Sequence, residues 1–311
     1  MRKLTVGMCV YDDFDGAYFS IQSIRLHHPE IINNIEFVII NNNPSSESGK
    51  ALKNYVMNNI TEPFQYLEFT KYNSTSLKNK IFDLADTPYV LCMDCHVLLE
   101  PQSLMRLVSY YDTGRDEGNL LQGPLLYDDL KSVSTHFNRE WGSQMLGKWD
   151  LDTRYKDKNT EPFEIPSQGM GLFSCRKDSW LGYNKNFRGF GGEECYIHDK
   201  YRAAGRKTMC LPFLRWNHRF TRVNGVPYPN TFDDRYRNYI IGFTELGKDI
   251  GEVEENFKSV LSADKRDEIK AEVRELFKVP VYSPPIEIKV PVTDTSGRAI
   301  TSYKGCGCGK G

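Results

Sequence analysis

Apolar and polar positions alternate in blocks along the first 100 residues, and each block has the length of one element. The run at 35–41, IEFVIIN, is apolar from Phe37 to Ile40, as expected of a strand that is covered on both faces. Similar strand-like runs lie at 3–10, 64–69 and 89–93, with helical segments at 17–28, 50–60 and 74–88. This order predicts an α/β fold with a mostly parallel central sheet and helices on both faces.

The pattern becomes less regular after residue 100. Residues 118–128 and 208–220 each predict one strand, and residues 168–180 predict a strand and a turn that contain several glycines. Residues 129–168 are polar and aromatic and predict an insertion of loops and short helices. Further helices are expected within 101–111, 189–205, 231–247 and 252–278, followed by a tail that is rich in proline, then polar, then rich in glycine.

Composition and charge limit the function classes. The chain has 311 residues, 40% of them apolar, and 40 basic against 41 acidic residues give a net charge of −1. This balance provides no global basic field for nucleic acid. No apolar run approaches the roughly 20 residues that cross a bilayer, so we expect no membrane span and a cytoplasmic protein. The eight cysteines are expected to be reduced thiols.

Candidate chemistry begins where the strand-like run 89–93 meets Asp94 and His96. Residues two apart on an extended backbone face the same side, so both side chains can converge on one ligand while Cys95 points away. A carboxylate with an imidazole suits Mn²⁺ or a similar divalent ion better than Ca²⁺. His218, at the end of a later strand, is the candidate third ligand. The simpler alternative is a turn-capping acid with a histidine packed nearby.

A second candidate is the sequence Gly191-Gly192-Glu193-Glu194. The two glycines allow close approach of the backbone to a ligand. The two acids fall in the first turn of a predicted helix, where the alternative role is stabilisation of the helix terminus by under ~1 kcal/mol each.

The stretch KYNSTSLKNKIFDLADTPYVLCMD, residues 71–94, resembles family 2-type glycosyltransferases of the GT-A fold. The matching positions are Asn73, Lys78, Asn79 and Asp94. The acid motif reads DxH, as in polypeptide N-acetylgalactosaminyltransferases, whose third metal ligand is a later histidine. The stretches GMGLFSCRKDSW and FGGEECYIHDKYRAAGRKTMCLPFLRWNHRF extend the resemblance, which covers roughly residues 4–222 and places His218 on that ligand.

The resemblance implies a metal-dependent enzyme that takes a nucleotide-diphosphate sugar, with UDP expected, and uses Mn²⁺ or another divalent cation. It implies that Asp94, His96 and His218 hold the metal and that Glu193 and Glu194 orient sugar and acceptor. Glu194 is the expected general base of an inverting enzyme, whereas a retaining enzyme needs no such base, and the two remain open. The expected nucleotide- and sugar-binding residues are Val10, Tyr11, Asp12, Asn41, Asn73, Lys78, Asn79, Met93, Asp94, Gly171, Gly191 and Gly192.

The implied organisation has four parts. They are a nucleotide-sugar half at 1–100, an acceptor and sugar half at 101–230, C-terminal helices at 231–279 and a flexible tail at 280–311. Phe190 departs from the family pattern, which has Trp before Gly-Gly-Glu. Because no lectin domain, anchor or disulfide framework is evident, we expect a compact enzyme of bacterial or phage type, in the cytoplasm of a bacterium or an infected host cell.

The sequence leaves more than one possible acceptor and more than one possible protein class. A saccharide, a protein side chain and a hydroxymethylated DNA base are the candidate acceptors. A nucleotidyltransferase would normally carry a basic, glycine-rich loop after the first strand, where this chain has the acidic YDDFDG. An inactive carbohydrate-binding or scaffold protein would not need the set of Asp94, His96, His218 and Glu193.

Overall fold

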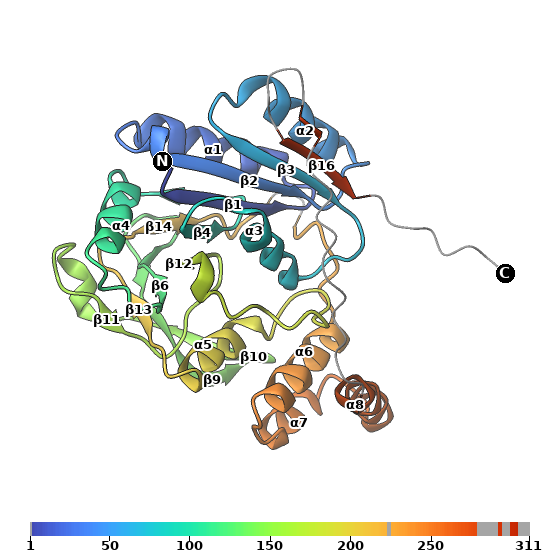
Figure 1. The fold of residues 1–311 in the computed structure, drawn as a ribbon. Coiled ribbons are helices and arrows are strands. Elements are labelled where there is room, and N and C mark those ends of the chain that lie inside the picture. Colours follow the sequence, from blue (N-terminus) through green and yellow to red (C-terminus); the bar gives the residue numbers. More distant parts are fainter. Residues whose placement is uncertain (1, 223–224, 279–291, 294–298, 304–311) are drawn as a thin grey trace.

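The computed structural model describes residues 2–222, 225–278, 292–293 and 299–303, and four parallel strands form its centre (Figure 1). These strands are β1 (Leu4–Val10), β2 (Ile35–Asn41), β3 (Phe64–Phe69) and β4 (Tyr89–Met93). They lie in the order β4-β1-β2-β3, with all three pairings parallel. All four match the predicted strand runs, and the mixed, mostly parallel sheet confirms the predicted fold class.

The sheet continues beyond β4 with strands from the second half of the chain. β12 (Leu172–Arg176) pairs antiparallel with β4 and is followed by β6 (Leu120–Gln122), β13 (Thr208–Cys210) and β11 (Phe163–Glu164). At the opposite edge β16 (Ala299–Tyr303) pairs parallel with β3, and β15 (Val292–Thr293) follows it. The rest of the predicted flexible tail, 280–311, lies outside the described residues.

Helices cover both faces because the central strands bury alternate side chains on opposite sides. In β2, Phe37 and Ile39 face the core with α1 (Phe14–His27), α2 (Glu47–Asn59) and α4 (Ser103–Asp112). Val38 and Ile40 face the other core with α3 (Asn79–Leu84), α5 (Glu193–Ala203) and α6 (Phe232–Glu245). Gly7 of β1 allows α3 to pack closely, since a Cβ there would lie 2.1 Å from Ile81.

Two segments that were each predicted as one strand are broken and cross between sheets. Residues 118–128 form β6 and then β7 (Leu125–Leu126), and residues 208–220 form β13 and then β14 (Trp216–His218). The second sheet has the order β5-β14-β7-β8, with β5 (Val97–Leu99) and β8 (Val133–Ser134). Each break contains a proline, which has no N–H for a ladder hydrogen bond.

The expected insertion of loops and short helices at 129–168 is mainly a β-hairpin. β9 (His136–Gly142) and β10 (Met145–Asp150) pair antiparallel, and the only helical turn described within 129–168 is η3 (Thr153–Lys156). Ser143 and Gln144 both have positive φ, at 49° and 60°, as in the tight turns that join hairpin strands.

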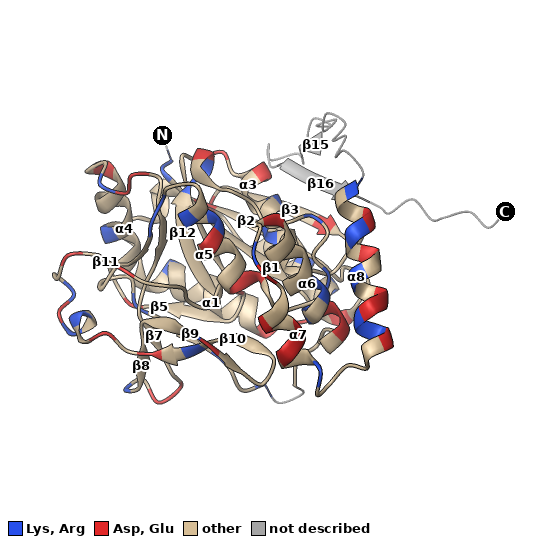
Figure 2. Cartoon of the chain, turned by 90° about the horizontal axis from the view of Figure 1, so that it is seen from below, with Lys and Arg blue, Asp and Glu red and all other residues tan. Residues whose placement is uncertain are grey.

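The remaining helices also differ from the sequence pattern. The predicted helix at 74–88 is a 3₁₀ turn, η2 (Thr75–Lys78), followed by the short α3, and the helix at 252–278 is divided into α7 (Gly251–Phe257) and α8 (Ala263–Lys278). Ser262 starts α8 by accepting a hydrogen bond from the Lys265 N–H. Charged residues of both signs lie along α8 (Figure 2). Among the described helices, none is long and apolar enough to span a membrane.

Candidate functional site

A cavity of about 400 Å³ lies beyond the carboxyl ends of β1 and β4. Ligands bind at this edge in open α/β sheets, where strand order changes direction. The lining comes from the end of β1, the turn after β4, η2, the segment before β12, the start of α5 and β14 with the residues that follow it. Segments far apart in the sequence therefore meet at one opening.

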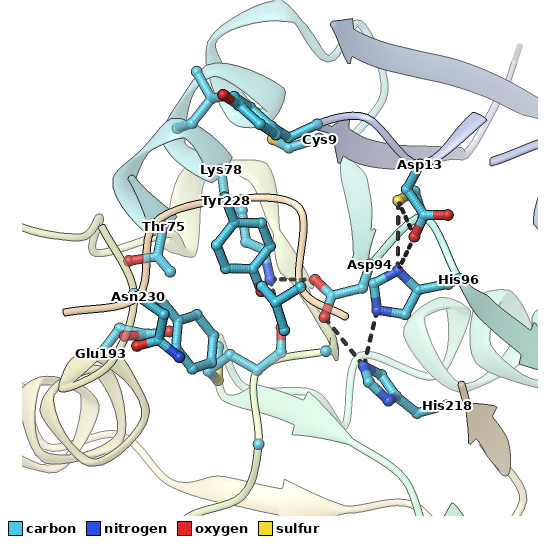
Figure 3. A pocket seen from close by; sticks show the side chains of 18 of the residues that line it. Cys9, Asp13, Thr75, Lys78, Asp94, His96, Glu193, His218, Tyr228 and Asn230 are labelled. Carbon is cyan, nitrogen blue, oxygen red and sulfur yellow. Dashed lines mark hydrogen bonds and ion pairs between the residues drawn. The ribbon is translucent and has the colours of Figure 1, made fainter. Parts of the chain in front are cut away.

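Asp94, His96 and His218 come together on one side of this cavity (Figure 3). The two histidine Nε2 atoms are 3.1 Å apart, and Asp94 Oδ2 lies 3.6 Å from His218 Nε2. β14 pairs with β5 so that His218 is opposite Val97, which places it beside His96. The sequence analysis expected Asp94 and His96 to converge along an extended strand. In the structure β4 ends at Met93, and the two side chains converge through the turn that follows it.

Cys95 does not point away from these groups. Its thiol Sγ lies 3.6 Å from His96 Nδ1 and 3.8 Å from Asp13 Oδ2. The tight turn after β4 brings three consecutive side chains to one region, which an extended backbone does not do.

Asp13 fixes the ring of His96. Its Oδ2 lies 2.9 Å from His96 Nδ1, and Arg222 Nη2 lies 2.7 Å from His96 Nε2. Arginine only donates and an ionised carboxylate only accepts, so His96 carries its proton on Nδ1 and a lone pair on Nε2. Burial opposes ionisation of Asp13, but hydrogen bonds from His96 and Arg219 outweigh it and lower the pKa of Asp13. Burial also lowers the pKa of His96, which favours the neutral form of the ring.

Lys78 forms a buried ion pair with Asp94. Its Nζ donates to Asp94 Oδ1 at 2.9 Å and to the Met170 carbonyl at 2.7 Å. Burial disfavours both charges, but the mutual attraction outweighs it, so the pKa of Lys78 is raised and that of Asp94 is lowered. Asp94 therefore keeps a negative oxygen, Oδ2, toward the two histidines, while Oδ1 is neutralised.

Glu193 and Glu194 begin α5 and line the cavity, although they are only 2% and 6% exposed. Within the described residues, the Oε2 atom of each has no hydrogen-bond partner. Burial and the neighbouring Glu194 raise the pKa of Glu193 well above its usual range, and burial raises the pKa of Glu194, with Arg235 opposing. Carboxylates with raised pKa values are suited to proton transfer near neutral pH.

The other predicted binding residues fall into two groups. Val10, Tyr11, Asn73 and Gly171 line the cavity with Lys78 and Asp94. Asp12, Asn41, Asn79, Met93, Gly191 and Gly192 are described but do not line it.

Several residues of the second group have internal partners instead. Asn41 donates to the Gly49 carbonyl and to the Tyr66 hydroxyl, and Asp12 accepts from Ser46 and Asn43. The Asn79 side chain donates to the carbonyl of Tyr183 and accepts from its N–H, 104 residues away in the sequence. Met93 is a fully buried core residue. Gly191 and Gly192 have φ values of 99° and 90° and shape the entry to α5.

Sequence reasoning missed cavity residues that stand next to predicted ones or in irregular segments. Asp13 follows Asp12, and Asn42 follows Asn41, so the pattern indicated the right turns but not the residue that faces the cavity. The position of Asp13 before a helical segment was an available signal, because its side chain caps α1 through the Gly16 N–H. Tyr228 was also missed and lines the cavity.

Comparisons with solved structures show the same fold. "Crystal structure of GalNAc-T7 with UDP, GalNAc and Mn2+" matches with a TM-score of 0.64 and 14% identity, over 89% of this chain but only 55% of that one. TarS from S. aureus, residues 1–349, matches with a TM-score of 0.50 and 12% identity, over 93% and 76% of the two chains. TarS residues 1–349 in complex with UDP-GlcNAc matches with a TM-score of 0.50 and 13% identity, over 88% of this chain and 71% of that one.

Comparisons of the sequence give the family. The comparison with curated proteins gave no match. The family model "Glycosyl transferase family 2" matches residues 5–179, which is more than half of the chain and contains Asp94 and His96. This chain belongs to glycosyl transferase family 2.

Proposed function

We propose that this protein is a metal-dependent glycosyltransferase that moves a sugar from a UDP-linked donor to a hydroxyl acceptor. The observation that carries the proposal is the convergence of Asp94, His96 and His218 at the cavity, because 122 residues separate the two histidines in the sequence. The family assignment favours a transferase over the nucleotidyltransferase and scaffold alternatives.

The three side chains fit a divalent cation. Their ligand atoms lie within 4.8 Å of one another, and the Nε2 lone pair of His96, which accepts from Arg222 at 2.7 Å, would bind the ion in place of that hydrogen bond. Donors on one small ion at about 2.1 Å stand about 3 Å apart when they are at right angles, close to the 3.1 Å between the two Nε2 atoms. One carboxylate with two imidazoles suits Mn²⁺. Such an ion, when bound, would neutralise the charge of a leaving diphosphate.

The chain's own residues support a nucleotide on the β1 side of the cation site. Tyr11 and Val10 line the cavity at the end of β1, and Asn73 lines it beside η2. An aromatic ring can stack on a base, and an amide can pair with a base edge. The structures of GalNAc-T7 with UDP and of TarS with UDP-GlcNAc support uridine as the base.

Glu193 and Glu194 are the residues proposed to contact the acceptor hydroxyl and the sugar. In an inverting reaction Glu194 would take the acceptor proton, since its raised pKa makes it a stronger base than an exposed glutamate. Glu193 would then accept hydrogen bonds from sugar hydroxyls through its unpartnered oxygen. The anomeric configuration of the product tests this assignment, because a retaining reaction does not need the base.

Thermal unfolding with UDP and Mn²⁺ tests the proposal. At a ligand concentration of about 100 Kd, binding adds about 2.7 kcal/mol to the free energy of unfolding, and a melting temperature roughly 5 °C higher is expected. We expect the rise to need both UDP and Mn²⁺ and to disappear in His218→Ala. His27→Ala, which alters an exposed histidine, is the matched control. A wild-type protein that responds to no UDP–metal combination would contradict the proposal.

A further inference from the structure

One wall of the cavity is apolar and comes from the β9–β10 hairpin. Phe137, Met145 and Trp149 form this wall, and the proposed cation and nucleotide sites use none of them. Two other tryptophans have a different role: Trp141 packs on Tyr239, and Trp180 stacks on Phe82 at a centroid distance of 4.5 Å. All three tryptophans pack against the core, but Trp149 is the one among them that also lines the cavity.

The fold holds Trp149 in place. Its ring lies 4.2 Å from the Phe137 ring, and the indole edge meets Gly169, where an added Cβ would lie 3.1 Å from it. Gly147, with φ 129°, makes the irregularity between the paired strands and lets the Phe137 ring approach to 2.8 Å of the position a Cβ would take. A wall with this support is rigid before a ligand arrives.

The apolar wall is close to the proposed reaction centre. Gly169 is two residues from Gly171, a span of at most about 7 Å. The Gly171 carbonyl accepts the Asp94 N–H at 2.8 Å, and a Cβ at Gly171 would lie 3.2 Å from Asp94 Oδ2. On the other side, the Cys195 thiol lies 3.2 Å from the Leu146 carbonyl and ties β10 to the first turn of α5. Trp149 and the reactive groups therefore line one cavity and are connected through the short segment from Gly169 to Gly171.

The charges around the cavity favour a neutral acceptor beside the nucleotide donor. Among the described lining residues, the lysines and arginines are Lys78 and Arg222, and each forms an ion pair, with Asp94 and with Asp13. Glu193 and Glu194 add two carboxyl groups to the cavity lining. A nucleic acid acceptor would need cations for its phosphates. A saccharide instead offers C–H faces to an aromatic ring and hydroxyls to carboxylates.

We propose that Phe137, Met145 and Trp149 form an acceptor subsite for a neutral saccharide, with one ring of the acceptor against Trp149 and its hydroxyl directed toward Glu194. This inference rests on the proposed function. It narrows the acceptor from three classes to one and makes Trp149 the specificity-determining residue of the hairpin.

Two variants on the same strand test the subsite. Trp149→Ala removes the indole, and Lys148→Ala changes the neighbouring residue, whose side chain is 55% exposed and pairs with Glu140. The probes are the methyl glycosides of glucose, galactose and N-acetylglucosamine, a serine- and threonine-containing peptide, and an oligonucleotide with hydroxymethylcytosine. Saturation-transfer NMR measures glycoside binding with UDP and Mn²⁺ present, and UDP release from UDP-sugars measures turnover.

We expect one or more glycosides to bind the wild type and to accelerate UDP release. Trp149→Ala should raise the KM for the glycoside at least tenfold, Trp149→Phe should restore it to within about threefold, and Lys148→Ala should leave it unchanged. The melting-temperature rise with UDP and Mn²⁺ should persist in all three variants, which separates this subsite from the donor site and shows that they fold.

Two results would overturn the subsite while leaving the transferase intact. One is a wild type that responds to UDP and Mn²⁺ but binds none of the glycosides, or is accelerated only by the peptide or the oligonucleotide. The other is an unchanged glycoside KM in Trp149→Ala. A wild type that does not respond to UDP and Mn²⁺ contradicts the proposed function itself, whatever the glycosides do.

Discussion

The hydrogen bond between Asp13 and His96 determines which nitrogen of the imidazole carries the lone pair. With the proton on Nδ1 and directed to Asp13, the lone pair of Nε2 points to the same region as His218 Nε2 and Asp94 Oδ2. Partners of this kind fix the ring orientation of a metal ligand and raise its basicity. Asp13 is therefore a positioning residue for the proposed cation site and does not need to touch the ion.

Replacing Asp13 tests this role at the residue scale. Asp13→Asn keeps an acceptor oxygen for the Gly16 N–H. It removes the negative charge that attracts Arg219 and Arg222 and that accepts the hydrogen bond from His96. We expect the Mn²⁺ concentration for half-maximal UDP-sugar turnover to rise 10- to 100-fold, with little change in kcat at saturating metal. The measurement is a Mn²⁺ titration of UDP release.

Asp12→Asn is the matched control for that titration. Asp12 adjoins Asp13 in the same turn, but its carboxylate accepts from Ser46 and Asn43 and does not line the cavity. The control should keep the wild-type Mn²⁺ midpoint. Equal midpoints for Asp13→Asn and the wild type would show that Asp13 does not act through His96.

Single positions were harder to predict than the turns that contain them. The sequence indicated that the residues after β1 and β2 face the ligand edge, but it could not choose between Asp12 and Asp13 or between Asn41 and Asn42. That choice depends on local φ and ψ, since Asp12 has a positive φ of 50°. Asp94, His96 and His218 were predictable because the DxH and later histidine of the family resemblance name residue types at given places.

At the scale of elements, the two glycines before α5 determine how Glu193 and Glu194 enter the cavity. Gly192 has φ 90°, and a Cβ there would lie 3.2 Å from the Tyr239 backbone N and from Asn238 Cβ. The helix α5 therefore starts directly against α6, with no space for a side chain. This close packing is why the two acids are buried.

Gly192→Ala is expected to destabilise the protein and to displace both acids. A left-handed conformation costs an alanine about 1 kcal/mol, and the contact with α6 adds to this cost. Gly205→Ala is the matched control, because Gly205 also has a positive φ, 71°, but no atom lies within 4 Å of its added Cβ. Chemical denaturation should give a loss for Gly192→Ala about 1–2 kcal/mol larger than for Gly205→Ala, together with lower turnover. Similar losses would show that the contact with α6 has no effect.

The elements that sequence reasoning predicted well are those whose pattern is set by the sheet. Strands β1 to β4 contribute to both cores, so each appears in the sequence as a short run rich in apolar residues. The hairpin at 136–150 was missed for physical reasons. Its turn uses Ser143 and Gln144 at positive φ in place of an Asn-Gly pair, and the irregularity at Gly147 interrupts the alternation of β10.

On the scale of the whole molecule, the site connects parts of the chain that are otherwise held by separate contacts. Asp94 extends from the central sheet, whereas His218 belongs to the second sheet through β14. α5 brings the acids from the opposite face, and α6 closes over it. The sequence analysis predicted one strand in each of the segments 118–128 and 208–220. It could not show that the two sheets meet at the site, because each segment in fact contributes one strand to each sheet.

A cation held by residues of both sheets should make their separation rarer, and this gives a prediction about the whole molecule. Hydrogen exchange of the amides in 94–99 and 214–220 should slow when Mn²⁺ is added, by up to about 100-fold at a Mn²⁺ concentration of 100 Kd. The Arg219 N–H, which donates to the His96 carbonyl, is the most direct reporter. The described helices α7 and α8 pack on α6, away from the cavity lining, and their amides should exchange at the same rate with and without Mn²⁺.

The same experiment on His218→Ala is the control and should show no slowing. Equal slowing in all segments would mean that Mn²⁺ acts on global stability, and no slowing in 94–99 and 214–220 would mean that the two sheets do not share an ion.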